Sequence, residues 1–254
     1  MVFDKKKHEK YLLHLIEEDK KEWENSRNSI NVEDLKEKTE YNDWFIKQMN
    51  LSEKDIFIDV GCAFGGLLAK AAKKCKYVVG VDIAEYMIKN TIKMLKDEKV
   101  NLISGHPKDA ENIEEHSAFV LEASAHDLPF EENTFDKISI KLDQNISLAD
   151  ETHHGELMQK YIKEAARVLK ENGFIYYFFD ANSKGSIPQI EIRVKTQIFS
   201  SLNKKLKKKE YKLKYIETKK QKNSEYLCEL RKMGQYMDVS EQYQVLFKFQ
   251  KVKL

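Results

Sequence analysis

Two acidic residues, each at the end of an apolar run, are the side chains of this sequence best placed for chemistry. Asp59 lies next to the end of the run IFIDV, which is followed directly by the glycine-rich turn GCAFGG and the helix-forming run LLAKAAKKC. Asp82 ends the next apolar run, VVGVD. Glycines let the backbone approach a ligand closely, a helix N-terminus offers unpaired N–H groups, and an acid at the second strand tip can accept both hydroxyls of a ribose. This order of strand, turn and helix predicts a site for an adenosine-containing cofactor.

Two later blocks narrow the choice of cofactor. The segment ASAHDLPFEENTFD (residues 123–136) resembles the "A-x-x-L-P-F, then F-D" signature of class I S-adenosylmethionine-dependent methyltransferases, and ARVLKENG (residues 166–173) resembles their "R-V-L-K-x-G-G" stretch. With the glycine turn and Asp82, the blocks cover residues 51–180 in the family's order. Taken alone, the glycine turn also fits a degenerate NAD fingerprint. The alternatives are therefore an NAD(P)-binding oxidoreductase and a partner subunit that binds the cofactor without catalysis.

The resemblance implies a fold, a cofactor and a set of binding residues. The fold is a doubly wound, Rossmann-like α/β arrangement with a seven-stranded, mostly parallel sheet, and the cofactor is S-adenosyl-L-methionine. Asp59 would lie near the amino group of the cofactor's methionine part, Asp82 would anchor the ribose, and Ile83 would pack on the adenine. The expected cofactor-binding residues are Asp59, Gly61, Cys62, Ala63, Gly65, Asp82, Ile83, Ser124, Ala125 and His126.

Two of these residues depart from the family pattern. Ala63 stands where the family has its middle glycine, and its methyl group narrows the approach to the backbone without closing it. Ser124 stands where the family usually has an aspartate that accepts from the exocyclic amine of adenine. A serine hydroxyl can still accept a hydrogen bond, although it carries no charge. We expect cofactor binding to persist with weaker polar recognition of adenine.

A histidine pair, His153 and His154, follows the fourth expected strand. Methyl transfer from a sulfonium is an in-line displacement that needs an aligned nucleophile. If that nucleophile is a hydroxyl, a histidine of near-neutral pKa is a suitable general base. An exposed, polar helix start explains the pair equally well. The expected substrate contacts, which fit a solvated loop equally well, are Lys141, Asp143 and Asn145.

Several kinds of substrate are disfavoured. Cys62 lacks the Pro-Cys context of covalent pyrimidine methylation and is interpreted as a small residue filling the loop, and the Asn/Asp-Pro-Pro-aromatic motif of base amino-group methylation is missing. The lysine run at residues 204–209 has no interleaved aromatics and fits a solvated helix face. We therefore expect O-methylation of a small polar metabolite, such as a sugar or a phosphorylated biosynthetic intermediate.

Alternating strands and helices are predicted to position these residues. Helix 155–170 carries apolar residues at three- and four-residue steps and is expected to end toward Gly173. The polar stretch 101–117 is interpreted as a surface excursion. Residues 189–209 predict a basic helix. The expected strands are 56–60, 77–82, 118–123, 136–141 and 174–179, followed by two half-buried strands near 211–215 and 243–249, the last antiparallel, with a long linker at 219–242.

Two helices are predicted before the first strand, over residues 8–24 and 40–49. Their apolar residues recur at helical spacing on a charged background. In methyltransferases that resemble this chain, such helices often form a cap over the active site, and covering a sheet edge is the alternative role. We divide the chain into a helical cap, residues 1–50, and a cofactor-binding domain, residues 51–254.

The composition excludes some classes of protein. The net charge is only +2, 34% of residues are charged, and the mean hydropathy is −0.63, so neither a nucleic-acid-binding surface nor a membrane span is expected. The apolar run near the first residue is too short for a signal peptide. Three cysteines without paired or metal-like spacing predict no metal site and favour a cytoplasmic protein. The oligomeric state is not predicted.

Overall fold

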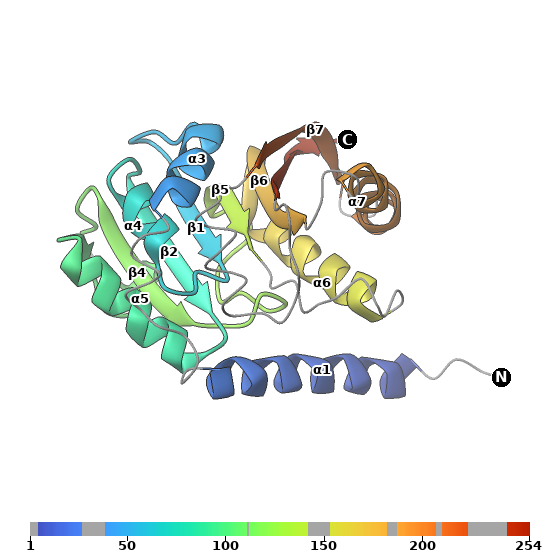
Figure 1. The fold of residues 1–254 in the computed structure, drawn as a ribbon, viewed down its shortest axis with the longest axis horizontal. Coiled ribbons are helices and arrows are strands. Elements are labelled where there is room, and N and C mark those ends of the chain that lie inside the picture. Colours follow the sequence, from blue (N-terminus) through green and yellow to red (C-terminus); the bar gives the residue numbers. More distant parts are fainter. Residues whose placement is uncertain are drawn as a thin grey trace.

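A computed structural model describes residues 5–26, 39–110, 112–141, 153–181, 187–206, 210–222 and 243–254. It contains one eight-stranded sheet in the order β3-β4-β2-β1-β5-β6-β8-β7, with helices on both faces (Figure 1). The strands are β1 (Ile56–Val60), β2 (Tyr77–Asp82), β3 (Asn101–Leu102), β4 (Ser117–Glu122), β5 (Phe135–Ile140), β6 (Leu169–Ala181), β7 (Tyr211–Lys222) and β8 (Tyr243–Lys253).

The first six strands run parallel, and β8 is antiparallel to both of its neighbours, β6 and β7. The strand order reverses at β1, which pairs with β2 on one side and with β5 on the other. In a doubly wound sheet such a switch point leaves a crevice at the carboxyl ends of the strands, where ligands bind. The antiparallel β8 also distinguishes this sheet from the all-parallel order 3-2-1-4-5-6 of dinucleotide-binding folds.

The helices form the outer layers. They are α1 (Lys5–Ser26), α3 (Thr39–Met49), α4 (Gly66–Ala72), α5 (Glu85–Asp97), a short 3₁₀ turn η1 (Pro107–Asp109), α6 (His153–Val168), and a continuous helical stretch made of α7 (Ile187–Arg193), the π-helix η3 (Val194–Ser200) and α8 (Ser201–Leu206). None of the described helices is long and apolar enough to cross a membrane.

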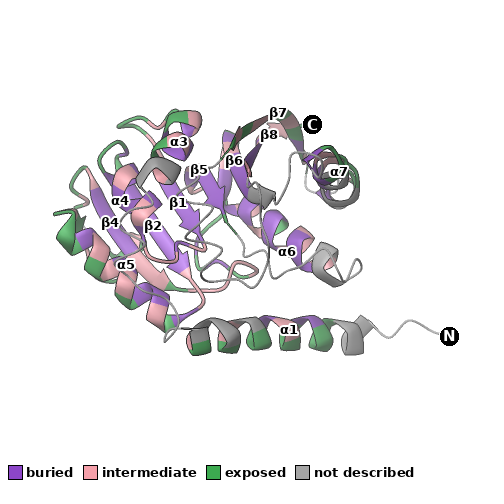
Figure 2. Ribbon diagram, in the orientation of Figure 1, coloured by how far each residue is buried: buried purple, intermediate pink, exposed green. Residues whose placement is uncertain are grey.

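Two hydrophobic clusters, one on each face of the sheet, hold these layers together (Figure 2). In β1, Ile58 and Val60 belong to the cluster that includes α1, α6 and α7–α8, whereas Phe57 belongs to the cluster that includes α3 and α4. Alternation follows from strand geometry, because successive side chains point to opposite faces. Both faces of β1 are therefore buried, which explains its continuous apolar sequence.

The doubly wound fold class is confirmed, and the sheet has one strand more than expected. The additional strand, β3, lies at the start of the stretch interpreted as a surface excursion. It has two residues and pairs only at the edge, with Ser117 and Ala118 of β4. A strand this short leaves no alternating pattern in the sequence, so periodicity could not reveal it.

The predicted end of helix 155–170 is wrong. The helix α6 ends at Val168, and Leu169 already pairs with Phe135 as the first residue of β6. Asn172, with a φ of +65°, takes the left-handed conformation expected near the glycine. Gly173 is needed for another reason: a Cβ there would lie 2.7 Å from the carbonyl oxygen of Asp136.

The C-terminal elements agree in type with the prediction and differ in length. The basic helix is present over residues 187–206, with a π-helical middle. The strand β7 continues to Lys222, so the linker that precedes β8 is shorter than expected. Its second half, TKKQK, has no apolar alternation, and pairing with β8 rather than local pattern defines it as a strand.

Candidate functional site

The carboxyl ends of four neighbouring strands bring the predicted cofactor residues together. In the order β4-β2-β1-β5, these ends carry Ser124, Asp82, Asp59 and Lys141, each within two residues of the last residue of its strand. Backbone hydrogen bonds hold them in register: Ala123 N–H donates to the carbonyl of Asp82 at 2.9 Å, and Lys141 N–H donates to that of Val60 at 3.2 Å. Residues far apart in sequence thus share one edge.

The glycine-rich turn between β1 and α4 depends on backbone conformations that favour glycine. Gly61 has a φ of +77° and Gly65 a φ of +76°. A Cβ at Gly61 would lie 2.6 Å from the carbonyl oxygen of Lys141, closer than any side chain tolerates. The turn therefore passes tightly over the end of β5, and both the conformation and the space require glycine at this position.

Ala63, the departure from the family pattern, also adopts a left-handed conformation, with a φ of +48°. Its N–H donates to Asp82 Oδ2 at 3.0 Å, and its carbonyl accepts from Thr91 Oγ1 at 2.6 Å. These two bonds offset the cost of placing a non-glycine residue there. Thr91, from α5, was not identified in the sequence, because a threonine within an amphipathic helix carries no distinguishing signal.

Asp82 shapes the turn in addition to its predicted role toward a ribose. Its second oxygen, Oδ1, accepts from Ala84 N–H at 3.1 Å. Burial raises the pKa of this carboxyl, while the N–H groups of Ala84, Ala63 and Ile83 pull the pKa back down. Each carboxylate oxygen has a further lone pair. Asp82 can therefore hold the loop and still accept hydrogen bonds from the hydroxyls of a ribose.

Asp59 is buried, with only 2% of its surface exposed, so it is not a solvated acid at the end of its strand. Its Oδ1 accepts a hydrogen bond from the Ser139 hydroxyl on β5. Burial raises its pKa to about 7, against the opposing effects of Ser139 and the Lys141 ammonium, and the charge of Asp82 adds to the rise. A cationic ligand beside this carboxyl would relieve the cost of ionising it.

Cys62 is buried inside the turn, where its Sγ lies 3.5 Å from Thr91 Oγ1. Burial, reinforced by the negative charges of Asp82 and Asp59, raises the pKa of the thiol. A neutral thiol is a poor nucleophile. The structure therefore agrees with the interpretation of Cys62 as a small residue that fills the loop.

The adenine end of the predicted site contains an interaction specific to this sequence. Ser124 Oγ and His126 Nδ1 share a hydrogen bond of 2.5 Å across a tight turn. Burial lowers the pKa of His126, and the charge of Lys160 lowers it further, which keeps the imidazole neutral near pH 7. Ser124 and Ala125 are half-buried, as is Ile83. A hydroxyl with a fixed partner presents its remaining lone pair in a defined direction.

The two late sequence blocks contact each other. Arg167 of α6 donates to the carbonyls of Leu128 and Phe130, at 2.9 and 2.7 Å, and pairs with Glu164 at 2.6 Å. Glu164 in turn accepts from Leu128 N–H at 3.0 Å. The arginine of the "R-V-L-K" stretch therefore positions the loop that follows Ser124, which gives a structural reason for the two blocks to occur together.

The helix α1 packs at the same edge of the sheet. Lys20 pairs with Glu122, the last residue of β4, at 2.5 Å, and Leu12 and Ile16 are buried in the core. The negative charge of Glu24 is close enough to Asp82 to raise its pKa slightly. Figure 1 shows α1 crossing below the strand ends. This placement suits a cap, although the division of the chain at residue 50 remains a prediction.

The predicted catalytic and substrate residues are only partly described. Lys141 is exposed at the strand end, and the charge of its ammonium group acts on the pKa of Asp59. His153 and His154 are the first two residues of α6, but their side chains lie outside the described part, as do Asp143 and Asn145. Among the described residues, no three His, Cys, Asp or Glu side chains are grouped to hold a metal ion.

The chemistry of the edge fits the expected cofactor. S-adenosylmethionine presents a ribose, an ammonium and a sulfonium, and the edge presents two carboxylates and a turn that passes within backbone contact of β5. Asp59 is the buried acid nearest the turn, and Lys141, whose ammonium acts on its pKa, is itself exposed. Buried charges in proteins are paired, so a cationic ligand suits this position.

Comparisons with known proteins place this edge in context. Residues 58–177 match the protein family described as "Methyltransferase domain". A probable cobalt-precorrin-6B C(15)-methyltransferase (decarboxylating) of Methanocaldococcus jannaschii is 30% identical over 79 residues, which cover 30% of this chain and 43% of that protein. The chain thus matches less than half the length of this relative.

Solved structures share the fold at low sequence identity. The YcgJ protein of Bacillus subtilis aligns with a TM-score of 0.54 at 13% identity, over 84% of this chain and 98% of that one. TYW2 of M. jannaschii, solved in complex with AdoMet, aligns with a TM-score of 0.51 at 15% identity, over 83% of this chain and 76% of that one. At these identities the likeness concerns the fold alone.

Proposed function

Because residues 58–177 identify this chain as a class I S-adenosylmethionine-dependent methyltransferase, we propose that it methylates an oxygen atom of a small polar metabolite, such as a sugar or a phosphorylated biosynthetic intermediate. The observation that carries the proposal is the buried Asp59 beside a glycine turn whose geometry Asp82 fixes. Bound S-adenosylmethionine supplies an electrophilic methyl group. The chain's own residues bind and orient it and its acceptor.

Asp82 accepts hydrogen bonds from the ribose hydroxyls. Asp59, in its ionised form, balances the positive charge of the cofactor's methionine part. Ser124 and Ala125 recognise the adenine edge through a hydroxyl lone pair and a backbone N–H. Lys141, Asp143 and Asn145 contact the acceptor, and His153 or His154 removes the hydroxyl proton. The cap formed by α1 excludes water from the reacting groups, as an in-line displacement requires.

Calorimetry with S-adenosylhomocysteine, S-adenosylmethionine and NAD tests the cofactor assignment. We expect binding of the first two and none of NAD. Asp82→Asn should weaken binding by about tenfold or more, since a charge-assisted hydrogen bond is lost. Glu122→Gln is the matched control: Glu122 is also a strand-tip acid, but it pairs with Lys20. Equal losses in both variants would remove Asp82 from the ribose site.

The histidine assignment has its own test. Replacing the catalytic member of His153 and His154 by alanine should lower kcat by about 10²–10⁴ while leaving cofactor affinity unchanged. The wild-type rate should fall below about pH 6.5, as imidazole becomes protonated. Full activity in both alanine variants, with a rate that stays flat between about pH 5.5 and pH 8, would indicate an acceptor that is already anionic. Lys141 would then position the charge of that acceptor.

A carbon acceptor is the second candidate, because the M. jannaschii relative is named for methylation at C(15) of a cobalt-precorrin. The similarity spans too little of either chain to carry that substrate over. Product analysis with a ¹³C-methyl cofactor distinguishes an O-methyl from a C-methyl group. Cofactor binding without turnover of any acceptor would instead support the catalytically inactive partner subunit.

A further inference from the structure

Three neighbouring strand ends offer a different group to each part of an adenosine-containing cofactor. Asp59 lies at the end of β1, Asp82 at the end of β2 and Ser124 two residues after β4. A cofactor with its methionine part at Asp59 and its ribose at Asp82 extends its adenine toward β4, since neighbouring strands are about 4.8 Å apart. The Ala123 N–H fixes this end by donating to the Asp82 carbonyl at 2.9 Å. In the proposed function the adenine thus lies beside Ser124.

The Ser124 hydroxyl has a titratable partner. Its Oγ lies 2.5 Å from His126 Nδ1, within a tight turn that the Asp127 N–H closes by donating to the Ser124 carbonyl at 3.1 Å. Both side chains of the pair are half-buried. In the described part of the chain, the His126 ring has no second hydrogen-bond partner. The imidazole can therefore act on a ligand through the hydroxyl of Ser124.

The loop that carries this turn is anchored on α6 by other residues. Arg167 donates to the carbonyls of Leu128 and Phe130, and Glu164 accepts from the Leu128 N–H. These anchors lie beyond the Ser124–His126 pair in the chain. The pair is thus not needed to hold the loop, and a substitution of either side chain should leave the loop in place.

The protonation state of His126 decides what the Ser124 hydroxyl offers. In a neutral imidazole with its proton on Nε2, Nδ1 accepts from the serine hydroxyl, and both lone pairs of Oγ are free to accept from an amine. In a protonated imidazole, Nδ1 donates to Oγ instead and occupies one of its lone pairs. The hydroxyl hydrogen then turns away from the ring, toward the side where an amine N–H would approach. Neutral His126 therefore makes Ser124 an acceptor, and protonation opposes that role.

The groups around His126 favour its neutral form. Burial lowers the pKa of the imidazole and the charge of Lys160 lowers it further, whereas Asp127 and Glu164 act in the opposite direction. Lys160 and Glu164 belong to α6, and Lys160 also pairs with Glu9 of α1 at 3.5 Å. The acceptor form of the pair is consequently the one present at neutral pH.

We propose that His126 is a positioning residue for the cofactor: it holds the Ser124 hydroxyl as an acceptor for the exocyclic amine of adenine, and so makes adenine recognition depend on pH. The inference rests on the proposed function, because it needs the cofactor's adenine beside Ser124. It assigns to two neutral side chains the role that one aspartate has in the family pattern. An aspartate accepts in every orientation, whereas this pair accepts only while the imidazole is neutral.

Calorimetric titration with 5′-methylthioadenosine between about pH 5 and pH 8 tests the proposal. This ligand has the adenosine of the cofactor but no ammonium and no sulfonium, so the charge of Asp59 does not enter. We expect the affinity of the wild type to fall by about three- to tenfold from neutral pH to the acid end of this range. The analogue without the 6-amino group should bind more weakly and show no such dependence, because it has no N–H for Ser124 to accept.

Two substitutions of His126 separate positioning from a merely structural role. His126→Phe should weaken binding of methylthioadenosine at neutral pH by about three- to tenfold, because the Ser124 hydroxyl loses its fixed direction. His126→Asn should recover most of that loss, since its amide oxygen can accept from the hydroxyl at every pH. Binding to both variants should be independent of pH. Thermal unfolding of each variant checks that the fold is retained.

His106→Asn is the matched control. The His106 ring contacts the same loop, with Nε2 2.6 Å from the Pro129 carbonyl, and its Nδ1 accepts from the Lys108 N–H at 3.1 Å, a capping role that asparagine can also fill. This variant should keep the pH dependence of the wild type.

Three results would overturn the role of His126. They are a pH dependence that persists in His126→Asn, an equal pH dependence for the analogue without the amine, and equal losses in His126→Phe and His106→Asn. A wild type that binds neither methylthioadenosine nor S-adenosylhomocysteine would instead remove the cofactor site itself, and the positioning role with it. Binding of both ligands without any effect of His126 would overturn the positioning role alone.

Discussion

The two ends of this sheet differ in how their polar side chains are held. At the carboxyl ends of the strands, Asp59 is buried, Asp82 is half-buried and accepts from the turn's backbone, and the turn takes left-handed conformations. At the far edge, exposed lysines stand on a helix and a strand that a few side-chain bonds hold together. The difference predicts that single substitutions lower the free energy of unfolding strongly at the carboxyl ends of the strands and only weakly at the far edge.

The largest effect is expected at Gly61. Gly61→Ala should destabilise the fold by about 2–5 kcal/mol, because a left-handed alanine is strained and its Cβ would meet the Lys141 carbonyl. Cofactor binding should be lost with it. Gly105→Ala is the matched control: Gly105 also has a positive φ, of +90°, but a Cβ there would meet nothing within 4 Å. The free energy of unfolding of both variants is measured in urea. Equal losses in the two variants would contradict the tight passage of the turn over β5.

The next effect is a pH dependence carried by Asp59. The pKa of its carboxyl is raised to about 7 in the fold, above the ordinary value near 4, so the native state holds a proton that the unfolded chain has released. The free energy of unfolding should therefore fall by about 2–4 kcal/mol as the pH rises from about 4 to about 7, and level off above that range. Asp59→Asn should remove this decline.

The same carboxyl should couple protons to the cofactor. A cationic ligand favours the ionised form, so affinity for S-adenosylmethionine should increase with pH up to about 7 in the wild type and not in Asp59→Asn. Calorimetry in two buffers of different ionisation enthalpy would detect the released proton. A pH-independent affinity in the wild type would mean that Asp59 does not face the cofactor's charge.

A smaller effect is expected where the helix meets the open sheet edge. Asn203→Ala removes both bonds to Leu213 and should cost about 1–2 kcal/mol, since these backbone groups are only partly shielded from water. Ser200→Ala, an exposed position of the same helical stretch, should change stability by less than about 0.5 kcal/mol. A loss below that level in Asn203→Ala would show that the apolar contacts of Leu202 and Leu206 alone hold the helix.

The smallest effect is expected for two exposed lysines at this far edge of the sheet, Lys204 and Lys212. Lys204→Gln and Lys212→Gln should each leave the free energy of unfolding within about 0.5 kcal/mol of the wild type, because exposed charges without partners contribute little. Thermal unfolding of the two single variants measures this directly. A loss of more than 1 kcal/mol would show that these lysines support the fold, and would erase the contrast between the two ends.

Much of the carboxyl-edge site was predictable because its chemistry is local in sequence. Asp59 with the turn at 61–66 forms one continuous segment, and Asp82 follows at the next strand tip. Its supporting residues were not predictable: Ser139 donates to Asp59 from the neighbouring strand β5, and Thr91 holds the turn from α5. A serine in a strand and a threonine in a helix acquire these roles only when the sheet is assembled.

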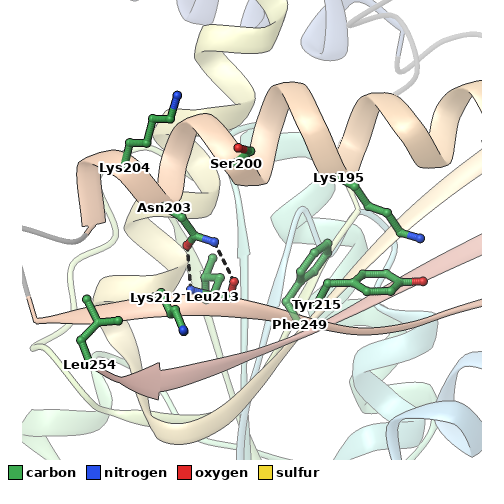
Figure 3. A pocket seen from close by; sticks show the side chains of 9 residues that line it. All are labelled: Lys195, Ser200, Asn203, Lys204, Lys212, Leu213, Tyr215, Phe249 and Leu254. Carbon is green, nitrogen blue, oxygen red and sulfur yellow. Dashed lines mark hydrogen bonds between the residues drawn. The ribbon is translucent and has the colours of Figure 1, made fainter.

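The charged C-terminal part shows the opposite case. The net charge of the whole chain is only +2 and does not reveal that lysines are concentrated in this part, residues 187–254. The lysine run at 204–209 by itself fits a solvated helix face. A pocket of about 470 Å³ lies where Leu213 and Tyr215 from one strand, and Phe249 from the next, meet a helix that is separated from Phe249 in sequence (Figure 3). No pattern within any one of these segments predicts a cavity.

The sequence by itself determined the order of strands and helices, the glycine turn and the acids at the strand tips, because periodicity and backbone conformation depend on near neighbours. Only the tertiary structure decided which of those acids is buried, where Gly173 meets β5, and how Arg167 holds the loop after Ser124. Burial, close backbone approach and pKa depend on atoms brought together from distant segments. Those contacts form only when the strands take their places in the sheet.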